Sequence, residues 1–330
     1  MRRQSLDARV ADALQEGLSL IERPYLALAN ALNCSEADVL EIAARLIAEG
    51  TVRSFGAFVD YERLGYEGYL CGLAVPEGEI DEVSAHLNSR GEVTHNYLRE
   101  GAVNIWFTAL LRMDGTSSLE AELRESGYPF VLLRTRRRIK LRPCFQITDE
   151  AGVVCAEAGD ENFSPLPADL DDGEIVGTLA LLQTDFPVEP RPFESAAHRL
   201  NIGVDGLLAR LVLLKECGIL RRIGASLHHV RAGYAFNTLL ALDCGAPEVA
   251  VETGQALSRH PWLSHCYLRS VAASTLSCAW PYELYAMIHA KRAEDLEERL
   301  AAVALEPSLR QMLAMPTVRE LKKSRYLLKK

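Results

Sequence analysis

The feature that most constrains the fold of this chain is an internal repeat, in which short sequence motifs of the first half recur in the second half. Gly50-Thr-Val-Arg-Ser-Phe-Gly-Ala57 matches Gly218-Ile-Leu-Arg-Arg-Ile-Gly-Ala225 at an offset of 168 (224 − 56), and Leu64-Gly-Tyr66 matches Ala232-Gly-Tyr234 at the same offset (234 − 66). Farther along, Asn104-Ile-Trp-Phe-Thr108 aligns with Glu283-Leu-Tyr-Ala-Met287 at 179 (283 − 104), which predicts an insertion around residues 271–282. Such a period indicates one structural unit used twice.

The first part of each copy has the pattern of a helix pair followed by strands. Ser35 is a good helix N-cap, with Asp38 three residues later, and Gly50 stands where a helix-ending glycine belongs. The apolar residues between them recur at helical spacing: Val39, Ala43, Leu46 and Ile47. An earlier helix is expected over residues 24–32, because it starts with proline. With a strand pair ending at Gly56-Ala57, this predicts a winged helix-turn-helix, repeated over residues 175–225.

The second part of each copy alternates strands and helices. In the first copy, strands are expected over residues 69–75, 93–99, 104–111 and 135–141, and helices over 80–87 and 117–126. The order β-α-β-β-α-β is that of a ferredoxin-like unit, and the second copy repeats it from Ala235 to Lys323.

The predicted fold class is therefore α+β, a tandem repeat of a winged helix-turn-helix and a ferredoxin-like domain. The expected boundaries are 1–62 and 63–150 for the first copy, 151–173 for a linker, and 174–230 and 231–330 for the second copy. A single ferredoxin-like unit leaves one sheet face bare. We expect the two copies to cover each other about a pseudo-two-fold axis, as an internal dimer.

A polar pattern recurs inside the repeated strands. His265, Tyr267 and Arg269 stand at alternate positions, as do His95, Tyr97 and Arg99 in the first copy. Alternate residues of a strand point to the same face of the sheet. A hydrophobic core has no use for such a trio, and its repetition 170 positions apart (265 − 95) favours a functional site.

Charge and composition narrow the class of ligand. The net charge of −9 counts against a general nucleic-acid binder. Basic residues nevertheless collect over residues 134–142 and 319–330. An acidic protein with local basic strands suits a compact polyanion better than a duplex.

Cysteine usage and hydropathy indicate the compartment. The eight cysteines are scattered without a Cys-x-x-Cys pair, so neither a zinc site nor a disulfide framework is indicated. No apolar run is long enough to cross a membrane, and residues 1–17 lack the apolar core of a signal peptide. The expected location is the cytoplasm.

The combination of helix-turn-helix and ferredoxin-like unit resembles the Lrp/AsnC family of transcription regulators. Several sequence motifs resemble those of one branch of this family, the siroheme decarboxylases in their fused two-subunit form. These motifs are Gln183-Thr-Asp-Phe-Pro187, Arg191-Pro-Phe193, Arg221-Arg-Ile-Gly-Ala225, His265-Cys-Tyr-Leu-Arg269 and Trp280-Pro-Tyr-Glu-Leu-Tyr-Ala-Met-Ile-His289. The resemblance covers nearly the whole chain. The first copy lacks the Trp-Pro-Tyr motif, and Glu283 stands where the family tends to have Asn.

The resemblance implies a reaction and a substrate. Siroheme decarboxylases remove carbon dioxide from the acetate side chains at ring positions 12 and 18 of siroheme, giving 12,18-didecarboxysiroheme for d1-type or alternative haem biosynthesis. The reaction implied uses no metal ion of the protein's own and no cofactor, because the iron arrives with the substrate. Which copy holds the productive site stays open, as do the order of the two steps and a further homodimer.

The chemistry calls for a proton donor and for cations. A histidine can donate a proton to the nascent methylene group. We predict His265 as this acid, and His95 as the acid for the other copy or the other acetate, with Tyr267 and Arg269 beside them. An axial bond to the substrate iron stays an alternative role.

Siroheme carries eight carboxylates, which guanidinium groups bind in bidentate fashion. The predicted substrate contacts are Arg53, Arg99, Arg221, Arg222, Arg231, Tyr97, His228, His229, Trp280, Tyr282 and Tyr285.

Weaker candidates come from the same reasoning. Arg63 and His289 are further possible contacts. Arg137, Lys140, Arg319 and Lys322, on the last strand of each copy, either guide the anion or blunt a sheet edge.

Two other functions remain as alternatives. The first is a DNA-binding regulator that reads bases with helices near residues 35–49 and 204–217. Those helices carry few base-reading side chains: Arg45 in the first, and Arg210 and Lys215 in the second. The second alternative is a haem-binding sensor or carrier without catalysis.

Overall fold

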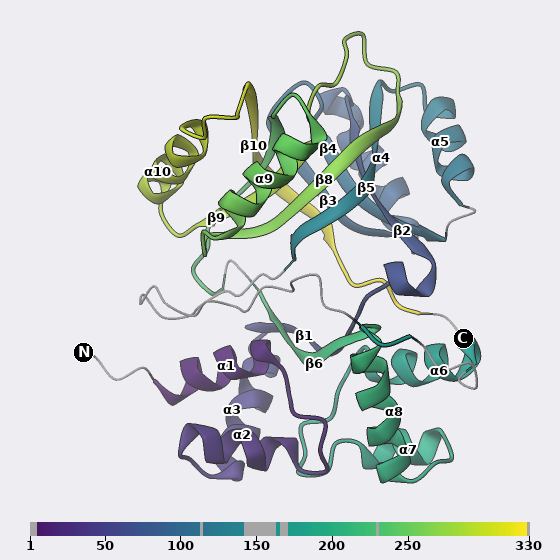
Figure 1. Ribbon diagram of the computed structural model, residues 1–330, viewed down its shortest axis with the longest axis vertical. Helices are drawn as coiled ribbons and strands as arrows, with labels where there is room; N and C mark the ends of the chain where they lie inside the picture. The colour runs from purple at the N-terminus through teal and green to yellow at the C-terminus, as the bar shows by residue number, and fades with distance from the viewer. Residues whose placement is uncertain (1–4, 113–114, 142–162, 166–170, 229–230, 329–330) are drawn as a thin grey trace.

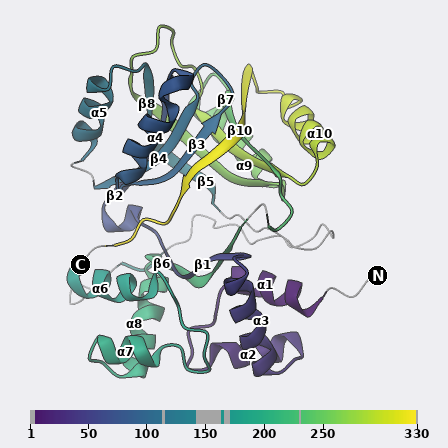
Figure 2. The same cartoon turned by 180° about the vertical axis from the view of Figure 1, so that it is seen from behind.

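The protein consists of two stacked layers in the computed structural model, which describes residues 5–112, 115–141, 163–165, 171–228 and 231–328 (Figure 1). The lower layer in this view holds the helix-turn-helix parts of both copies side by side, and the upper layer holds the strands of both ferredoxin-like parts. The same arrangement is seen from behind in Figure 2. No helix in the described ranges is long and apolar enough to cross a bilayer.

The lower layer contains corresponding elements from the two copies. The first contributes α1 (Leu6–Glu16), α2 (Pro24–Leu32), α3 (Glu36–Ala48) and β1 (Val52–Val59). The second contributes α6 (Asp172–Leu182), α7 (Glu194–Arg199), α8 (Val204–Glu216) and β6 (Leu220–Leu227). Ser35 and Asp38 form the reciprocal capping box at the start of α3. The buried stripe of α3 includes Ile42, whereas Ile47, which we predicted on it, is 37% exposed.

The predicted strand pair within each helix-turn-helix is wrong, because each copy provides only one strand. β1 pairs antiparallel with β6 of the other copy, from Val52↔Leu227 to Val59↔Leu220. Gly56 and Gly224 face each other at the centre of this ribbon, where a Cβ on Gly56 would lie 2.5 Å from the carbonyl oxygen of Gln183. The repeated Gly-Ala word therefore permits close approach of backbones at the junction of the copies.

The upper layer has the predicted β-α-β-β-α-β order in each copy. The first copy runs β2 (Tyr66–Leu73), α4 (Ile80–Ser89), β3 (Val93–Arg99), β4 (Ile105–Arg112), α5 (Thr116–Glu125) and β5 (Phe130–Leu141). The second runs β7 (Phe236–Asp243), α9 (Pro247–Ser258), β8 (Leu263–Ser274), β9 (Leu284–Ala290), α10 (Ala293–Ala304) and β10 (Gln311–Lys323). Two short 3-10 turns, Glu62–Leu64 and Glu77–Glu79, flank β2 and α4. The fold class is confirmed.

The two ferredoxin-like units meet edge to edge rather than face to face. Their strands form one closed barrel in the order β10-β3-β4-β2-β5-β8-β9-β7. Closure depends on the pseudo-equivalent pairs β5·β8 and β10·β3. The bare sheet faces thus become the interior of a barrel, with the helices outside (Figures 1 and 2).

Closure also corrects the edge-blunting role predicted for the basic residues of the last strands. The last strands have no free edge to blunt, since each pairs on both sides. Lys140 donates from Nζ to the carbonyl oxygens of Ser258 and His260 at the end of α9, and Lys322 makes the equivalent bonds to Asn88 and Arg90 at the end of α4. These two lysines cap helix C-termini. Arg319 pairs with Asp81 on the surface, and Arg137 is exposed.

The barrel interior is filled at one end only. Its core consists of Leu70, Trp106, Val131, Leu133, Leu239, Ala241, Tyr285 and Met315. The predicted insertion lengthens β8 to Ser274 and adds the connection to β9, from which Leu276, Trp280 and Tyr282 pack onto this core. The other end of the barrel faces the β1–β6 ribbon and is open.

Candidate functional site

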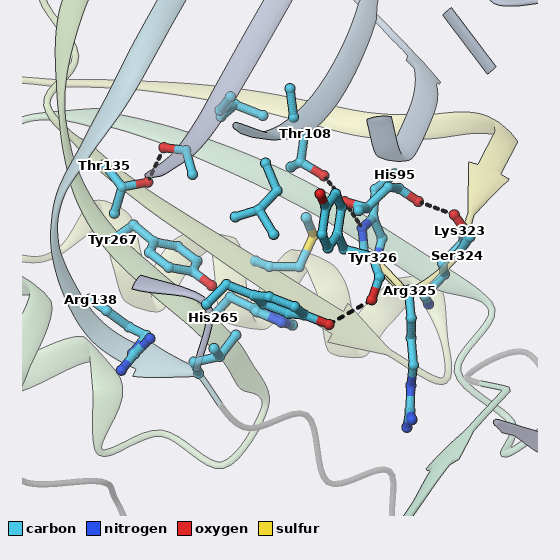
Figure 3. Close-up of a pocket in the computed structure, with 18 of the residues that line it drawn as sticks. His95, Thr108, Thr135, Arg138, His265, Tyr267, Lys323, Ser324, Arg325 and Tyr326 are labelled. Carbon is cyan, nitrogen blue, oxygen red and sulfur yellow. Dashed lines mark hydrogen bonds between the residues drawn. The ribbon is translucent and has the colours of Figure 1, made fainter. Parts of the chain in front are cut away.

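A cavity of about 680 Å³ lies between the open end of the barrel and the β1–β6 ribbon. Both copies line it, because barrel strands and ribbon strands from each half face the same space. Figure 3 shows His95, His265 and Tyr267 around the cavity together with Arg325 and Tyr326 from the segment after β10. Its size is that of a site for a small organic ligand.

The two His-Tyr-Arg rows line this single cavity. His95, Tyr97 and Arg99 come from β3, and His265, Tyr267 and Arg269 come from β8. Within each row the imidazole stacks beside the tyrosine ring, with centroids 6.4 Å apart in the first and 6.3 Å in the second. The guanidinium lies over the same tyrosine, at 4.9 Å and 4.8 Å. The strand alternation predicted from sequence thus turns all six side chains toward the cavity, from strands β3 and β8 on opposite sides of the barrel.

Burial keeps both histidines neutral at pH 7. Burial lowers the pKa of His95 to about 4, helped by the positive charges of Lys323 and Arg53. Burial also lowers the pKa of His265 to about 3, with His95 and Lys323 adding to the effect. Each imidazole is oriented by a neighbouring hydroxyl: Thr94 Oγ1 lies 3.0 Å from Nδ1 of His95, and Ser264 Oγ lies 2.7 Å from Nδ1 of His265.

The two arginines of the rows are buried without a carboxylate partner among the described residues. Arg99 is 2% exposed and Arg269 is 7% exposed. Arg99 donates to the Met315 carbonyl and to Thr317, and Arg269 donates to Thr135, but Nε of each makes no hydrogen bond to any described group. Burial lowers the pKa of Arg99 to about 10 and also lowers that of Arg269. A buried guanidinium with unused donors favours an anionic ligand.

Positive charge dominates the described residues of the cavity wall. The wall carries eight cationic side chains against the two acids Asp60 and Glu62. The cationic residues are Arg53, Arg99, Arg138, Arg221, Arg222, Arg269, Lys323 and Arg325. Converging guanidinium groups at this density are the arrangement expected for a ligand with several carboxylates.

Three of the predicted arginines extend from the ribbon, and each has an anchoring contact. Arg53 donates to Glu320 at 2.8 Å, and Arg221 donates to Asp60 at 2.7 Å. Arg222 stacks on the ring of Phe58 at 3.8 Å. Tyr285, also predicted, lies on the wall beside Arg269 in the barrel.

Four predicted contacts lie outside the residues that line the cavity. Trp280 and Tyr282 lie behind Trp106 and Tyr285. The ring centroids of Trp280 and Trp106 are 5.7 Å apart. Their predicted stacking on a macrocycle does not fit this position, because the insertion folds over the filled end of the barrel.

The other two predicted contacts outside the cavity lining, Arg231 and His228, lie in the connection after β6. Arg231 packs beside Gly50, and the backbone N–H of His228 donates to the carbonyl oxygen of Thr51. His229 lies outside the described residues. Arg63, a weaker candidate, stacks on Phe163 away from the wall.

Several wall residues were missed by the sequence reasoning. Arg138 belongs to the basic run noted on the last strand of the first copy, but nothing in that run singles it out. The last residue of β10, Lys323, lines the wall, and the segment after β10 contributes Ser324, Arg325, Tyr326 and Leu327. This segment is held by Gln183, whose side chain donates to the Tyr326 carbonyl and accepts from the Leu328 N–H.

Comparisons with known proteins agree with the fold and the repeat. The AsnC-like ligand binding domain model matches residues 63–125 and 231–322, and the siroheme decarboxylase NirDL-like HTH domain model matches residues 7–53 and 178–221. The chain is 30% identical over 323 residues to a siroheme decarboxylase of Hydrogenobacter thermophilus, covering 96% of this chain and 93% of that protein.

Two crystal structures are similar over almost the full length. One is of the siroheme decarboxylase NirDL, with a TM-score of 0.70, 26% identity, and coverage of 98% of this chain and 94% of that one. The other is of the siroheme decarboxylase NirDL in complex with an iron-uroporphyrin III analogue, with a TM-score of 0.70, 25% identity, and coverage of 97% and 93%.

Proposed function

The chain belongs to the siroheme decarboxylase family, and we propose on this premise that its cavity binds siroheme and releases carbon dioxide from the acetates at ring positions 12 and 18. The enzyme is then a carboxy-lyase whose product is 12,18-didecarboxysiroheme, for d1-type or alternative haem biosynthesis. A full-length relative bears this name, and another was crystallised with an iron-uroporphyrin analogue.

One observation carries the assignment to this cavity. The two His-Tyr-Arg rows line the same space, and each ends in a buried arginine without a carboxylate partner among the described residues. A tetrapyrrole with carboxylates around its rim supplies such partners at several points at once. Both imidazoles then face one macrocycle, which supports one acid for each of the two acetates.

The chemical step breaks the bond between the acetate methylene and its carboxylate carbon. Carbon dioxide leaves, and the electron pair stays on the methylene carbon, where the conjugated macrocycle delocalises it. A proton then completes the methyl group. We assign this proton to His265 for one acetate and to His95 for the other. Tyr267 and Tyr97 lie beside the imidazoles, and Arg269 and Arg99 hold neighbouring carboxylates.

The depressed pKa values of the two histidines bear on this role. An imidazole with a pKa of about 3 or 4 is deprotonated at cell pH, and therefore holds only its single N–H proton. A bound polyanion favours the protonated form, because an opposite charge nearby raises the pKa of a histidine. The proton given to the methylene carbon is therefore this N–H proton, and the carboxylates of the bound substrate favour its replacement from solvent.

The proposal extends to cofactors, partners and location. The iron arrives as part of the substrate, and no further cofactor takes part. The two copies act as an internal pseudo-dimer, and a further homodimer is compatible with the cavity, which both copies of one chain complete.

The protein works in the cytoplasm without nucleic acid. Arg45 pairs with Asp7, and Arg210 pairs with Glu174, so one arginine of each proposed reading helix already has an acidic partner.

The test is anaerobic incubation of the purified protein with siroheme, followed by mass spectrometry of the tetrapyrrole. The expected result is a product lighter by two carbon dioxides. A tetrapyrrole that is bound but unchanged in mass would indicate a carrier or sensor instead. A gel-shift assay at low salt tests the regulator alternative, and no retarded complex is expected.

A further inference from the structure

His265 is the end of a chain of hydrogen bonds that leads to a second buried imidazole. Nδ1 of His265 lies 2.7 Å from Ser264 Oγ, and the same oxygen lies 2.9 Å from Nε2 of His289. His289 comes from β9, lines the cavity and is 5% exposed. Ser264 is also 5% exposed, so the chain runs through protein rather than through open solvent.

The two imidazoles are the nearest hydrogen-bond partners of the Ser264 hydroxyl. The hydroxyl of Ser264 lies 3.5 Å from the Met287 carbonyl, much farther than from His265. A relay toward His265 requires that Ser264 donates its proton to Nδ1 of His265 and accepts one from Nε2 of His289. In this arrangement His265 carries its own proton on Nε2, the nitrogen not engaged by Ser264.

The first copy lacks the second imidazole. His95 contacts the hydroxyl of Thr94 at 3.0 Å, and Thr94 contacts Thr108 at 2.9 Å, so the chain reaches a hydroxyl instead of a histidine. Thr108 pairs with His95 as Met287 pairs with His265, which places Leu110 at the position equivalent to His289. The two otherwise similar rows therefore differ in the group behind the imidazole.

We propose that His289, acting through Ser264, is a positioning and proton-relay residue for His265 and has no counterpart behind His95. The inference rests on the proposed function, since it assigns a role within the same reaction. His289 keeps His265 in the Nε2–H form and resupplies the proton that His265 gives up.

The proton balance of the step is closed. His265 gives its Nε2 proton to the methylene carbon left by carbon dioxide. Its Nδ1 takes the Ser264 proton, Ser264 takes the Nε2 proton of His289, and His289 takes a proton from water on Nδ1. The starting tautomers are restored when His265 takes a proton from water on Nε2, its Nδ1 proton returns through Ser264 to Nε2 of His289, and His289 releases its Nδ1 proton to water. One proton from solvent is consumed for each carbon dioxide released, and no redox change occurs.

The test uses variants that copy the first half of the chain. His289→Leu introduces the residue found at Leu110, Ser264→Ala removes the relay hydroxyl, and Ser264→Thr keeps it as Thr94 does. His86→Leu is the matched control, because His86 is exposed and pairs with Glu122 outside the cavity. Anaerobic turnover of siroheme is followed with the products separated by the number of carboxyl groups lost.

The expected result is a selective defect. His289→Leu and Ser264→Ala lower kcat about tenfold with KM within twofold and accumulate a singly decarboxylated product, because the step served by His95 is intact. His86→Leu matches the unaltered protein, and Ser264→Thr, which keeps the hydroxyl, has a higher kcat than Ser264→Ala. Equal kcat for His289→Leu and the unaltered protein overturns the relay while leaving the proposed function standing. Absence of any carbon dioxide loss from the unaltered protein overturns both.

A second measurement does not depend on turnover or on the stability of the variants. Nitrogen-15 NMR of the imidazoles in the unaltered protein reports the tautomer of His265. The relay requires the Nε2–H form, with a shift toward the mixed tautomers of a free imidazole in Ser264→Ala. A His265 that carries its proton on Nδ1 in the unaltered protein overturns the proposal.

Discussion

Asp60, in the first half of the chain, accepts a hydrogen bond of 2.7 Å from Arg221 of the second half. The same carboxylate oxygen accepts a hydrogen bond of 2.6 Å from Arg138 on β5. The carboxylate is 5% exposed and joins the ribbon to the barrel at the rim of the cavity. Asp60 therefore holds two guanidinium groups in place before the substrate binds. This lowers the entropic cost of binding, because the two side chains are already ordered.

Replacing Asp60 by Asn should lower the free energy of unfolding by about 3 kcal/mol, because removing one member of a buried ion pair leaves its partners uncompensated. The measurement is urea denaturation at pH 7. Asp81→Asn is the control, since Asp81 is exposed and pairs with Arg319 on the surface, where the cost should stay within about 0.5 kcal/mol. Equal losses in the two variants would contradict the role of Asp60.

The acid role of His265 predicts a defect in turnover with binding retained. His265→Ala should lower kcat about 100-fold or more, which is the range for loss of a general acid. Titration with siroheme under anaerobic conditions should still show a complex. His86→Ala is the control and should match the unaltered protein. Undiminished turnover in His265→Ala rules this residue out as the acid.

The neutral histidines predict how stability depends on pH in the absence of ligand. Their pKa values of about 4 and about 3 lie below the value of about 6.5 in the unfolded chain. Between these values the unfolded state binds more protons, so stability is full above about pH 6.5 and falls as the pH is lowered toward 4. Lys323, which faces both imidazoles, keeps its charge over this range, because burial lowers its pKa only to about 8.

The measurement compares the free energy of unfolding at pH 7 and pH 5. The unaltered protein should lose on the order of 1 kcal/mol per histidine for each pH unit. The double variant His95→Gln, His265→Gln should show a shallower decline. An identical decline in both proteins would mean that the two imidazoles are not held neutral.

The segment after β10 predicts a contribution to substrate affinity. Arg325 stacks on Phe58 at 3.9 Å and donates to the Gln183 carbonyl, and its Nη2 is buried without a hydrogen bond to a described group. Arg325→Gln should weaken binding of iron-uroporphyrin about tenfold, the loss expected for one charge-assisted contact. Arg319→Gln is the charge-matched control. Equal affinity in both variants would remove Arg325 from the site.

Much of this architecture was predictable because a repeat shows its periodicity directly. Strand alternation alone predicts that the three side chains of each His-Tyr-Arg row share one face of their strand, and local chemistry predicts the helix starts at Ser35 and Pro24. The closure of the barrel could not be predicted, because the β5·β8 and β10·β3 pairings join residues far apart in the sequence. The same reason explains the wrong strand pair, since β1 finds its partner β6 in the other copy.

The missed site residues share a physical cause. Asp60, Arg138 and Arg325 reach the cavity through contacts between layers, which no local pattern records. Trp280 and Tyr282 were predicted at the macrocycle because aromatic residues suit stacking, but the filled end of the barrel offers them a larger apolar contact. Lys140 and Lys322 bind helix ends for which sequence spacing gives no signal.

The central claim is that one cavity, completed by two diverged copies, presents both imidazoles to a single tetrapyrrole. A crystal structure of this protein with iron-uroporphyrin bound tests it most directly. The predicted result is one macrocycle per chain between the barrel and the ribbon, with His95 and His265 each beside a carboxylate-bearing side chain and with Arg99 and Arg269 on carboxylates. A macrocycle bound elsewhere, or one that touches neither imidazole, would contradict the account.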